Sequence, residues 1–108
     1  MVDVGTRFGY PRTAMPERRT KNEWDVEFGT FVRRLRKARH WAIADLARRM
    51  DMTPQYISSF ERGANTLTAM TLRSLSSALN IRMSELLRMF EEEQDAKRAA
   101  AEPKPSGT

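Results

Sequence analysis

The side chains that could do chemistry in this sequence are mainly hydrogen-bonding groups, and the types needed for catalysis are largely missing. The 108 residues contain no cysteine and a single histidine, His40. Thiolate and histidine-cluster metal sites are therefore excluded. The sequence also lacks a glycine-rich phosphate loop and a carboxylate pair placed for acid–base catalysis. We accordingly expect neither an enzyme nor a bound metal, cofactor or small-molecule ligand.

The most informative hydrogen-bonding groups follow Thr53 and share one side of a predicted helix that ends at Gly63. At 100° per residue, Ile57 and Phe60 face inward, with Glu61 close to them. The opposite side carries four residues: Gln55, Ser58, Ser59 and Arg62. Glutamine can bind N6 and N7 of adenine, and serine can donate to or accept from any base edge. This face favours contact with base pairs, and an ordinary polar surface is the alternative.

The excess positive charge lies in the same part of the chain and in the segment before it. The formal net charge is +5. Residues 1–24 have five basic and three acidic side chains, for +2, and residues 25–63 have eight and five, for +3. Residues 64–108 have six of each, which cancel. Such a distribution suits neutralisation of DNA phosphates, so nucleic acid is the favoured partner.

The elements that must position these groups are helices, because the apolar residues between the two ends recur with a helical period. We expect an all-α, five-helix bundle with helices over about 23–39, 43–50, 54–62 and 69–79 and a last helix from about 83. Asn22 and Thr53 are the expected N-caps, and Pro54 occupies a first helical position. Gly63 and Asn80 are expected to end their helices in the left-handed conformation.

Both ends of the chain differ in composition from this bundle. Residues 1–21 predict a flexible basic arm, in which Arg18, Arg19 and Lys21 are candidates for minor-groove contact; disorder without contact is the alternative. We expect the domain over 22–93 and a disordered tail over 94–108, whose first part could prolong the last helix. No apolar run reaches membrane-spanning length and no signal peptide is evident, which predicts a cytoplasmic protein.

The two short helices joined by Asp51-Met52 have the layout of a helix-turn-helix. From Phe28 to Leu87 the sequence resembles the phage-repressor and Cro-like (XRE-type) helix-turn-helix domains. The residues that carry the resemblance are Phe28-Gly29, Leu35-Arg36, Asp45-Leu46-Ala47, Thr53, Tyr56-Ile57-Ser58, Glu61-Arg62-Gly63, Thr71-Leu72, Ala78-Leu79 and Glu85-Leu86. The ordered set at fixed spacing is specific, although no single piece of it is.

The resemblance implies roles for individual residues. Base reading falls to the start of the third helix, at Thr53, Pro54, Gln55 and Ser59, and the face analysis adds Ser58. The candidates for phosphate contact are Tyr56, Arg62, Asn65, Thr66 and Thr68. An arginine late in the first helix pairs with the glutamate that ends the third, which here are Arg36 and Glu61. This ion pair is structural.

The sequence departs from the family pattern at several positions. Ala42 and Ile43 stand where the family often has a serine N-cap followed by a phosphate-contacting glutamine. Asp45 could satisfy part of the free N–H groups at that helix end. His40 replaces the usual glycine, and Pro54 cannot donate a hydrogen bond to a base. Direct base readout is expected to be thin, with DNA shape or the arm supplying the rest.

The last helix bears more apolar surface than a terminal helix needs. Met83, Leu87 and Phe90 are the candidates for a homodimer interface, and the alternative is that they all serve the chain's own core. The expected function is a dimeric transcriptional regulator, a repressor, that binds a palindromic operator in double-stranded DNA. The alternative is an antitoxin or other module that binds a protein partner through its C-terminal tail and regulates its own operon.

Overall fold

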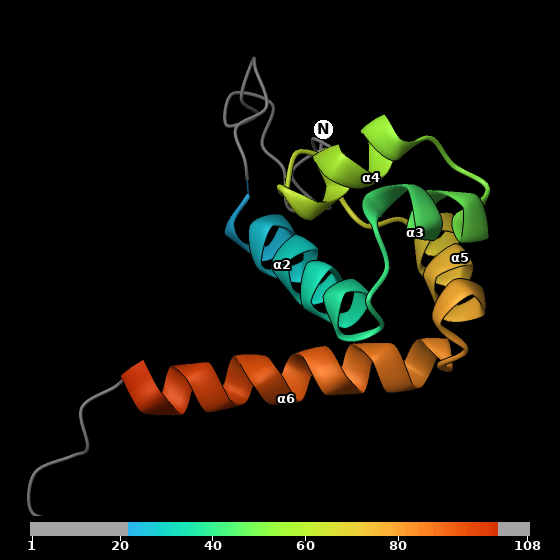
Figure 1. Ribbon diagram of the computed structural model, residues 1–108. Helices are drawn as coiled ribbons and strands as arrows, with labels where there is room; N and C mark the ends of the chain where they lie inside the picture. The colour runs from blue at the N-terminus through green and yellow to red at the C-terminus, as the bar shows by residue number, and fades with distance from the viewer. Residues whose placement is uncertain (1–21, 102–108) are drawn as a thin grey trace, which may run out of the picture.

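The computed structural model describes residues 22–101, and in that part of the chain all regular structure is helical (Figure 1). The five helices are α2 (Glu23–Ala38), α3 (Ile43–Met50), α4 (Pro54–Glu61), α5 (Ala69–Leu79) and α6 (Met83–Ala101). The prediction of an all-α fold with five helices in this order is confirmed. The predicted basic arm with Arg18, Arg19 and Lys21 lies outside the described residues, as do residues 102–108.

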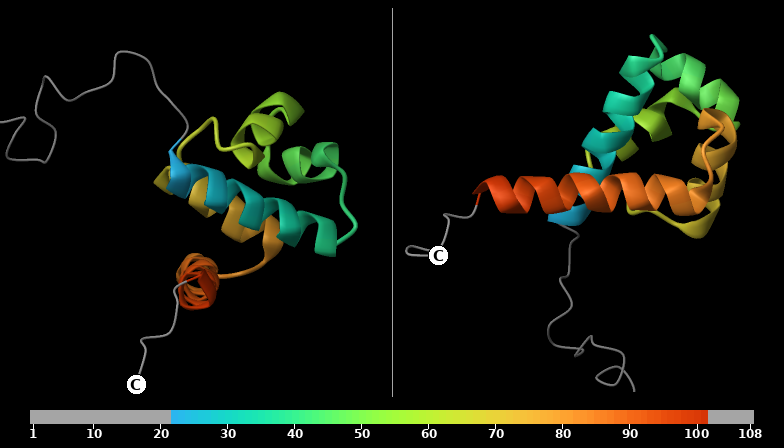
Figure 2. Two further views of the ribbon diagram at one scale, coloured as in Figure 1. Left: turned by 90° about the vertical axis from the view of Figure 1, so that its left-hand side faces the viewer. Right: turned by 90° about the horizontal axis from the view of Figure 1, so that it is seen from below.

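Helices α2, α3, α4 and α5 pack together, and α6 lies below them in the view of Figure 1 (Figures 1 and 2). Helix α4 packs against α2 and α3, α3 packs against α5, and α5 packs against α6. In both figures α6 runs under α2 and its C-terminal end extends beyond it. No helix among residues 22–101 combines the length and the apolar character needed to cross a membrane.

The core is built from apolar residues of all five helices. The buried apolar residues are Phe28, Phe31, Val32, Leu46, Ala47, Met50, Ile57, Phe60, Leu75, Leu79, Leu86 and Phe90. The Phe28 ring lies at its aromatic centre, with centroid distances of 5.6 Å to Phe31, 6.1 Å to Phe60 and 5.0 Å to Phe90. Edge-to-face and tilted contacts at such distances stabilise the packing beyond area burial alone.

The position of Phe90 corrects the prediction that it faces a second subunit. Its side chain is only 2% exposed and lies against Phe28 and Phe31. Because α6 crosses under the first half of α2, Phe90 fills the space beneath these rings. Met83, by contrast, is 44% exposed, and Leu87 is partly buried.

The helix ends follow local sequence rules. Asn22 Oδ1 accepts from the N–H groups of Trp24 at 2.8 Å and Asp25 at 3.4 Å. Thr53 Oγ1 accepts from the N–H of Tyr56 at 3.1 Å, with Pro54 in the first turn. Both N-cap predictions are confirmed, and both caps satisfy N–H groups that a helix start leaves free.

Helix α3 lacks a side-chain cap at Ala42, and Asp45 compensates, as predicted. Asp45 Oδ2 accepts from the N–H of Ala42 at 2.8 Å, and its Oδ1 accepts from Arg48 at 3.0 Å. The backbone hydrogen bond from Ala42, and then Arg48, lower the pKa of Asp45 below its usual value. The carboxylate is thereby kept charged at the positive end of the helix dipole.

Among residues 22–101, four have the left-handed backbone conformation that reverses the chain between helices. Gly63 has φ 83° and Asn80 has φ 58°, so both end their helices as predicted. Asp51 in the helix-turn-helix link has φ 59°, and His40, before α3, has φ 61°. The backbone at His40 therefore has the conformation for which glycine is the usual choice.

The last helix extends beyond the predicted domain boundary at residue 93, in agreement with the alternative of a prolonged helix. Residues 94–101 continue α6 instead of beginning a disordered tail. Glu93 pairs with Arg34 of α2, and Glu27 of α2 contacts both Gln94 and Lys97. The glutamate- and alanine-rich composition favours the helix, and these polar contacts hold it against α2.

Candidate nucleic-acid interface

Helices α3 and α4 form a compact pair whose geometry starts at the turn between them. The N–H of Met52 donates to Ala47 O at 2.9 Å, and Asp51 turns the chain in the left-handed conformation. Leu46, Ala47 and Met50 of α3 and Ile57 and Phe60 of α4 are buried. Burial of these faces fixes which side of α4 is left to solvent.

The solvent side of α4 carries the polar stripe expected from the sequence. Gln55 and Arg62 are exposed, and Ser58 and Ser59 are partly buried between them. Together with Pro54 and with Ile43 of α3, these four residues line one shallow hollow. The predicted base-reading residues after Thr53 therefore lie side by side. Thr53 is also exposed, although its hydroxyl already caps the helix.

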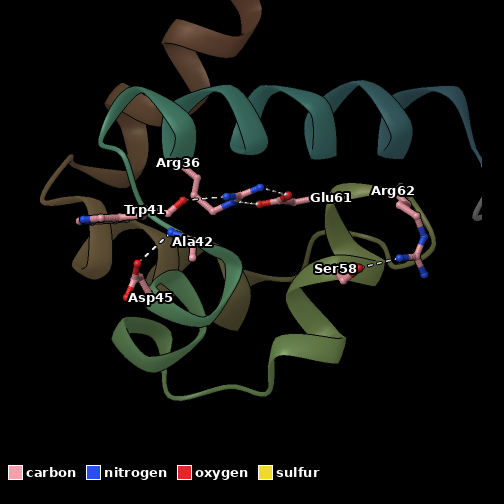
Figure 3. Close-up of polar contacts among 7 residues, drawn as sticks. All are labelled: Arg36, Trp41, Ala42, Asp45, Ser58, Glu61 and Arg62. Atoms are coloured by element: carbon pink, nitrogen blue, oxygen red, sulfur yellow. Dashed lines mark hydrogen bonds and ion pairs between the residues drawn. The ribbon is translucent and has the colours of Figure 1, made fainter.

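A buried ion pair joins α4 to α2 (Figure 3). Arg36 Nε donates to Glu61 Oε2 at 2.7 Å, and Arg36 Nη2 donates to Glu61 Oε1 at 3.0 Å. The third donor, Arg36 Nη1, reaches Trp41 O at 2.7 Å. Arg36 is 6% exposed and Glu61 is 7% exposed. The predicted pair is thus present, and it keeps the only acidic residue of α4 away from the outward face.

A glycine that sequence reasoning did not single out sets the distance between α2 and α4. A Cβ built on Gly29 would lie 2.6 Å from Glu61 O and would also clash with Phe60 O. Since Glu61 and Phe60 form the end of α4, the absence of a side chain at Gly29 lets the two helices meet. The sequence offered one indication of this role, the Phe28-Gly29 motif. Helical periodicity, however, does not reveal that the backbones of α2 and α4 approach closely at Gly29.

All three hydroxyl groups predicted to contact phosphate already have partners in the protein. Tyr56 Oη lies 3.0 Å from Thr71 Oγ1, and Thr68 Oγ1 donates to the same oxygen at 3.1 Å. Thr66 Oγ1 donates to Asp25 Oδ1 at 3.0 Å. These bonds tie the loop after α4 to α2 and α5. The buried Thr71, whose role the sequence did not indicate, joins Tyr56 to Thr68.

The basic side chains around this surface differ in their contacts: Arg62 is hydrogen-bonded to a serine, whereas Arg39 and Arg49 lie against a tryptophan ring. Arg62 Nη1 donates to Ser58 Oγ at 2.6 Å, along the outward face of α4 (Figure 3). The Arg49 guanidinium lies 4.2 Å from the centre of the Trp41 ring, and that of Arg39 lies 5.5 Å from it. Trp41 therefore packs against these two side chains and stacks with their cations. Within residues 22–101 no group of three or more histidine or acidic side chains could hold a metal ion.

Comparison with known proteins agrees with this geometry. A family model described as Helix-turn-helix matches residues 32–86, which is more than half of the chain. Its limits enclose α3, α4 and α5 and the buried Arg36–Glu61 pair. Among curated proteins, none matches the chain by sequence.

Solved structures of bacterial regulators have the same fold. The restriction-modification controller protein C.AhdI from Aeromonas hydrophila is 29% identical, with a TM-score of 0.57 over 60% of this chain and 98% of that one. The wild-type controller protein C.Esp1396I is 20% identical, with a TM-score of 0.63 over 69% and 97%. The clp gene regulator ClgR from Corynebacterium glutamicum is 21% identical, with a TM-score of 0.64 over 75% and 86%.

The order of the helices, the polar outward face of α4 and the match over residues 32–86 lead to one assignment. The family consists of DNA-binding proteins and not of enzymes. The chain belongs to the Cro-like (XRE) helix-turn-helix family of DNA-binding transcription regulators.

Proposed function

We propose that this regulator binds a palindromic operator in double-stranded DNA as a homodimer and represses transcription from it. The observation that carries the proposal is the outward face of α4, where Gln55, Ser58, Ser59 and Arg62 line one hollow and the only acid of the helix is buried. A helix with such a face fits the major groove, where side-chain donors and acceptors meet base edges and no carboxylate repels phosphate.

In this proposal Gln55 makes the main direct base contact. Its side chain is exposed in the first turn of α4, the part of a recognition helix that enters the groove first. A glutamine amide can bind N6 and N7 of one adenine. Thr53 and Pro54 supply apolar contact and shape, since the Thr53 hydroxyl is occupied and Pro54 has no N–H. Ser59 lies beside Gln55 as a further donor.

Phosphate contacts come from the loop after α4 and the start of α5. Asn65 is partly buried in this loop, and its side-chain amide has no hydrogen-bond partner among the described residues. The start of α5 offers backbone N–H groups that precede its first intrahelical bond. The Tyr56–Thr71–Thr68 hydroxyl network supports this role because it holds α5 at a fixed position relative to α4.

The similarity to C.AhdI favours a narrower candidate, a controller of a restriction–modification system. C.AhdI is a restriction-modification controller protein, and this chain covers 98% of its length at 29% identity. A gene for a restriction enzyme or methyltransferase beside the gene for this chain would support that role. A neighbouring toxin gene would instead favour the antitoxin alternative.

The experiment that tests the proposal is selection of bound sequences from a random duplex library with the purified full-length protein. We expect an enriched inverted repeat with half-sites one helical turn apart, or about 34 Å. A reporter promoter that carries this repeat should then lose activity when the protein is expressed. A folded protein that enriches no sequence would contradict the proposal.

The role of Gln55 is tested on the selected operator. Gln55→Ala should weaken specific binding about tenfold, in line with the loss of one bidentate base contact, and leave binding to random duplex unchanged. The control is Ser77→Ala, an exposed serine on α5, which should bind both duplexes like the original protein. An equal loss on both duplexes would remove Gln55 from base reading.

A further inference from the structure

The hydrogen bond between Arg62 and Ser58 points this arginine back along α4. Arg62 is the residue that follows α4, and Ser58 lies one turn before it on the same face. Arg62 Nη1 donates to Ser58 Oγ at 2.6 Å, so the guanidinium is turned back along the helix, as Figure 3 shows. Its charged end therefore lies over the outward face of α4.

The guanidinium is held there without a compensating negative charge. The adjacent acid, Glu61, is buried and paired with Arg36. No other carboxylate among the described residues forms an ion pair with Arg62. Arg62 is exposed and lines the same hollow as Gln55 and Ser58. An unpaired cation at this place is oriented toward the surface that faces DNA.

This direction matters because an arginine can contact DNA in two different ways. A freely moving side chain finds the nearest phosphate, which carries no sequence information. A guanidinium held in one place over the groove face can use two parallel N–H groups to bind O6 and N7 of guanine. Arginine has five N–H donors, so the bond to Ser58 leaves enough donors for that contact.

The axial position of the guanidinium sets which base pair it would meet. Ser58 lies three residues after Gln55, which is about 4.5 Å along a helix that rises 1.5 Å per residue. Successive base pairs of B-DNA are about 3.4 Å apart. The guanidinium beside Ser58 therefore lies one to two base pairs from the one that Gln55 meets.

We propose that Arg62 reads a guanine one or two base pairs from the position read by Gln55, and that Ser58 orients the Arg62 guanidinium instead of contacting a base itself. This inference rests on the proposed insertion of α4 into the major groove. It replaces the phosphate contact expected of Arg62 and the base contact expected of Ser58 with a two-residue unit in which only Arg62 touches DNA.

The test repeats the library selection with four full-length variants. Arg62→Ala should lose the guanine preference at one position in each half-site, by about tenfold, while affinity for random duplex and its salt dependence stay unchanged. Ser58→Ala should weaken the same preference, and Ser58→Thr, which keeps the hydroxyl, should restore it. The control is Arg48→Ala, an exposed arginine of α3 that pairs with Asp45, which should alter no base preference.

The outcomes separate this inference from the proposed function. If Arg62→Ala lowers affinity for all sequences alike and reduces the salt slope by about 0.9, Arg62 contacts a phosphate and the inference is wrong. If Ser58→Ala keeps the full guanine preference, Ser58 has no orienting role. In both cases an inverted repeat selected by the original protein leaves the proposed function standing. Failure of the original protein to select any sequence overturns the proposed function itself.

Discussion

At the scale of single residues, the interface depends on the Arg36–Glu61 pair, whose effect on stability is large because both side chains are buried. Arg36 uses three donors, two on Glu61 and one on the carbonyl of Trp41. Moving two charges out of water carries a desolvation penalty, which is offset when the pair has good geometry and all its donors are hydrogen-bonded. The pair therefore holds the end of α4 against α2. Loss of one partner would leave the other as an unpaired buried charge.

The ion pair yields the first prediction on stability. Arg36→Met should lower the free energy of unfolding by about 3–5 kcal/mol because Glu61 remains as an unpaired buried carboxylate. The double variant Arg36→Met, Glu61→Leu should lose less than the sum of the two single variants. Urea unfolding followed by circular dichroism measures all three. The control, Arg34→Ala, removes an exposed pair and should cost less than about 1 kcal/mol. Strictly additive losses would contradict the coupling.

The strained backbone at His40 yields a second prediction. His40 has φ 61° and an exposed side chain, so glycine should be accommodated with less strain. His40→Gly should raise the free energy of unfolding by about 0.5–1 kcal/mol, which is the left-handed penalty less the entropy lost by glycine. The melting temperature measures the change. Arg33→Gly, in the middle of α2, should instead lower stability by about 1 kcal/mol. Destabilisation by His40→Gly would show that the imidazole itself contributes.

At the scale of elements, the contact between α2 and α4 positions the DNA-facing stripe. Gly29 permits close backbone contact at the end of α4, and the Arg36–Glu61 pair holds the same end. The two features act on one helix terminus, so the orientation of α4 depends on α2 as well as on the helix-turn-helix link. Two of the residues that carry this dependence, Gly29 and Arg36, lie in α2 and not in α4.

Gly29→Ala is the corresponding prediction. The new Cβ would meet Glu61 O at 2.6 Å, a contact with backbone that cannot rotate away. We expect a loss of about 1–3 kcal/mol in stability, as for overpacked cores, together with weaker binding to the selected operator because α4 shifts. Thermal unfolding and operator titration measure the two effects. Thr30→Ala, at the adjacent exposed position, should leave both nearly unchanged. Unchanged stability and affinity in Gly29→Ala would mean that the helices separate freely.

At the scale of the whole molecule, the proposed homodimer needs a surface that the protomer leaves open. Phe90 is buried, so two of the three predicted interface residues remain available, the exposed Met83 and the partly buried Leu87. A two-fold axis near them would present two copies of α4 to successive major-groove faces of one operator.

The dimer prediction follows from these two residues. Met83→Glu with Leu87→Glu should shift the sedimenting species to monomer mass, because two charges would have to be buried at the interface. Operator binding should weaken with it, since one module makes few specific contacts. Circular dichroism checks that the helices persist, and Arg73→Glu, exposed on α5, is the control. An unchanged dimer mass would place the interface elsewhere. Phe90→Glu is unsuitable because it would disrupt the core.

The sequence by itself determined the features that depend on neighbouring residues. The N-caps at Asn22 and Thr53, the helix ends at Gly63 and Asn80 and the order of the helices follow from short-range hydrogen bonding and the helical period. The helical period also predicted which residues of α4 are buried and which face outward. The resemblance to Cro-like domains added the partner of Arg36.

Only the tertiary structure decided the features that depend on how helices cross. Periodicity shows that Phe90 is on an apolar face, but only the crossing of α6 under α2 puts it against Phe28. The contacts of Glu93, Gln94 and Lys97 with α2 join residues that lie far apart in the sequence. Gly29 matters because a carbonyl from α4 lies against it. These contacts depend on distances between elements, which spacing along the chain does not specify.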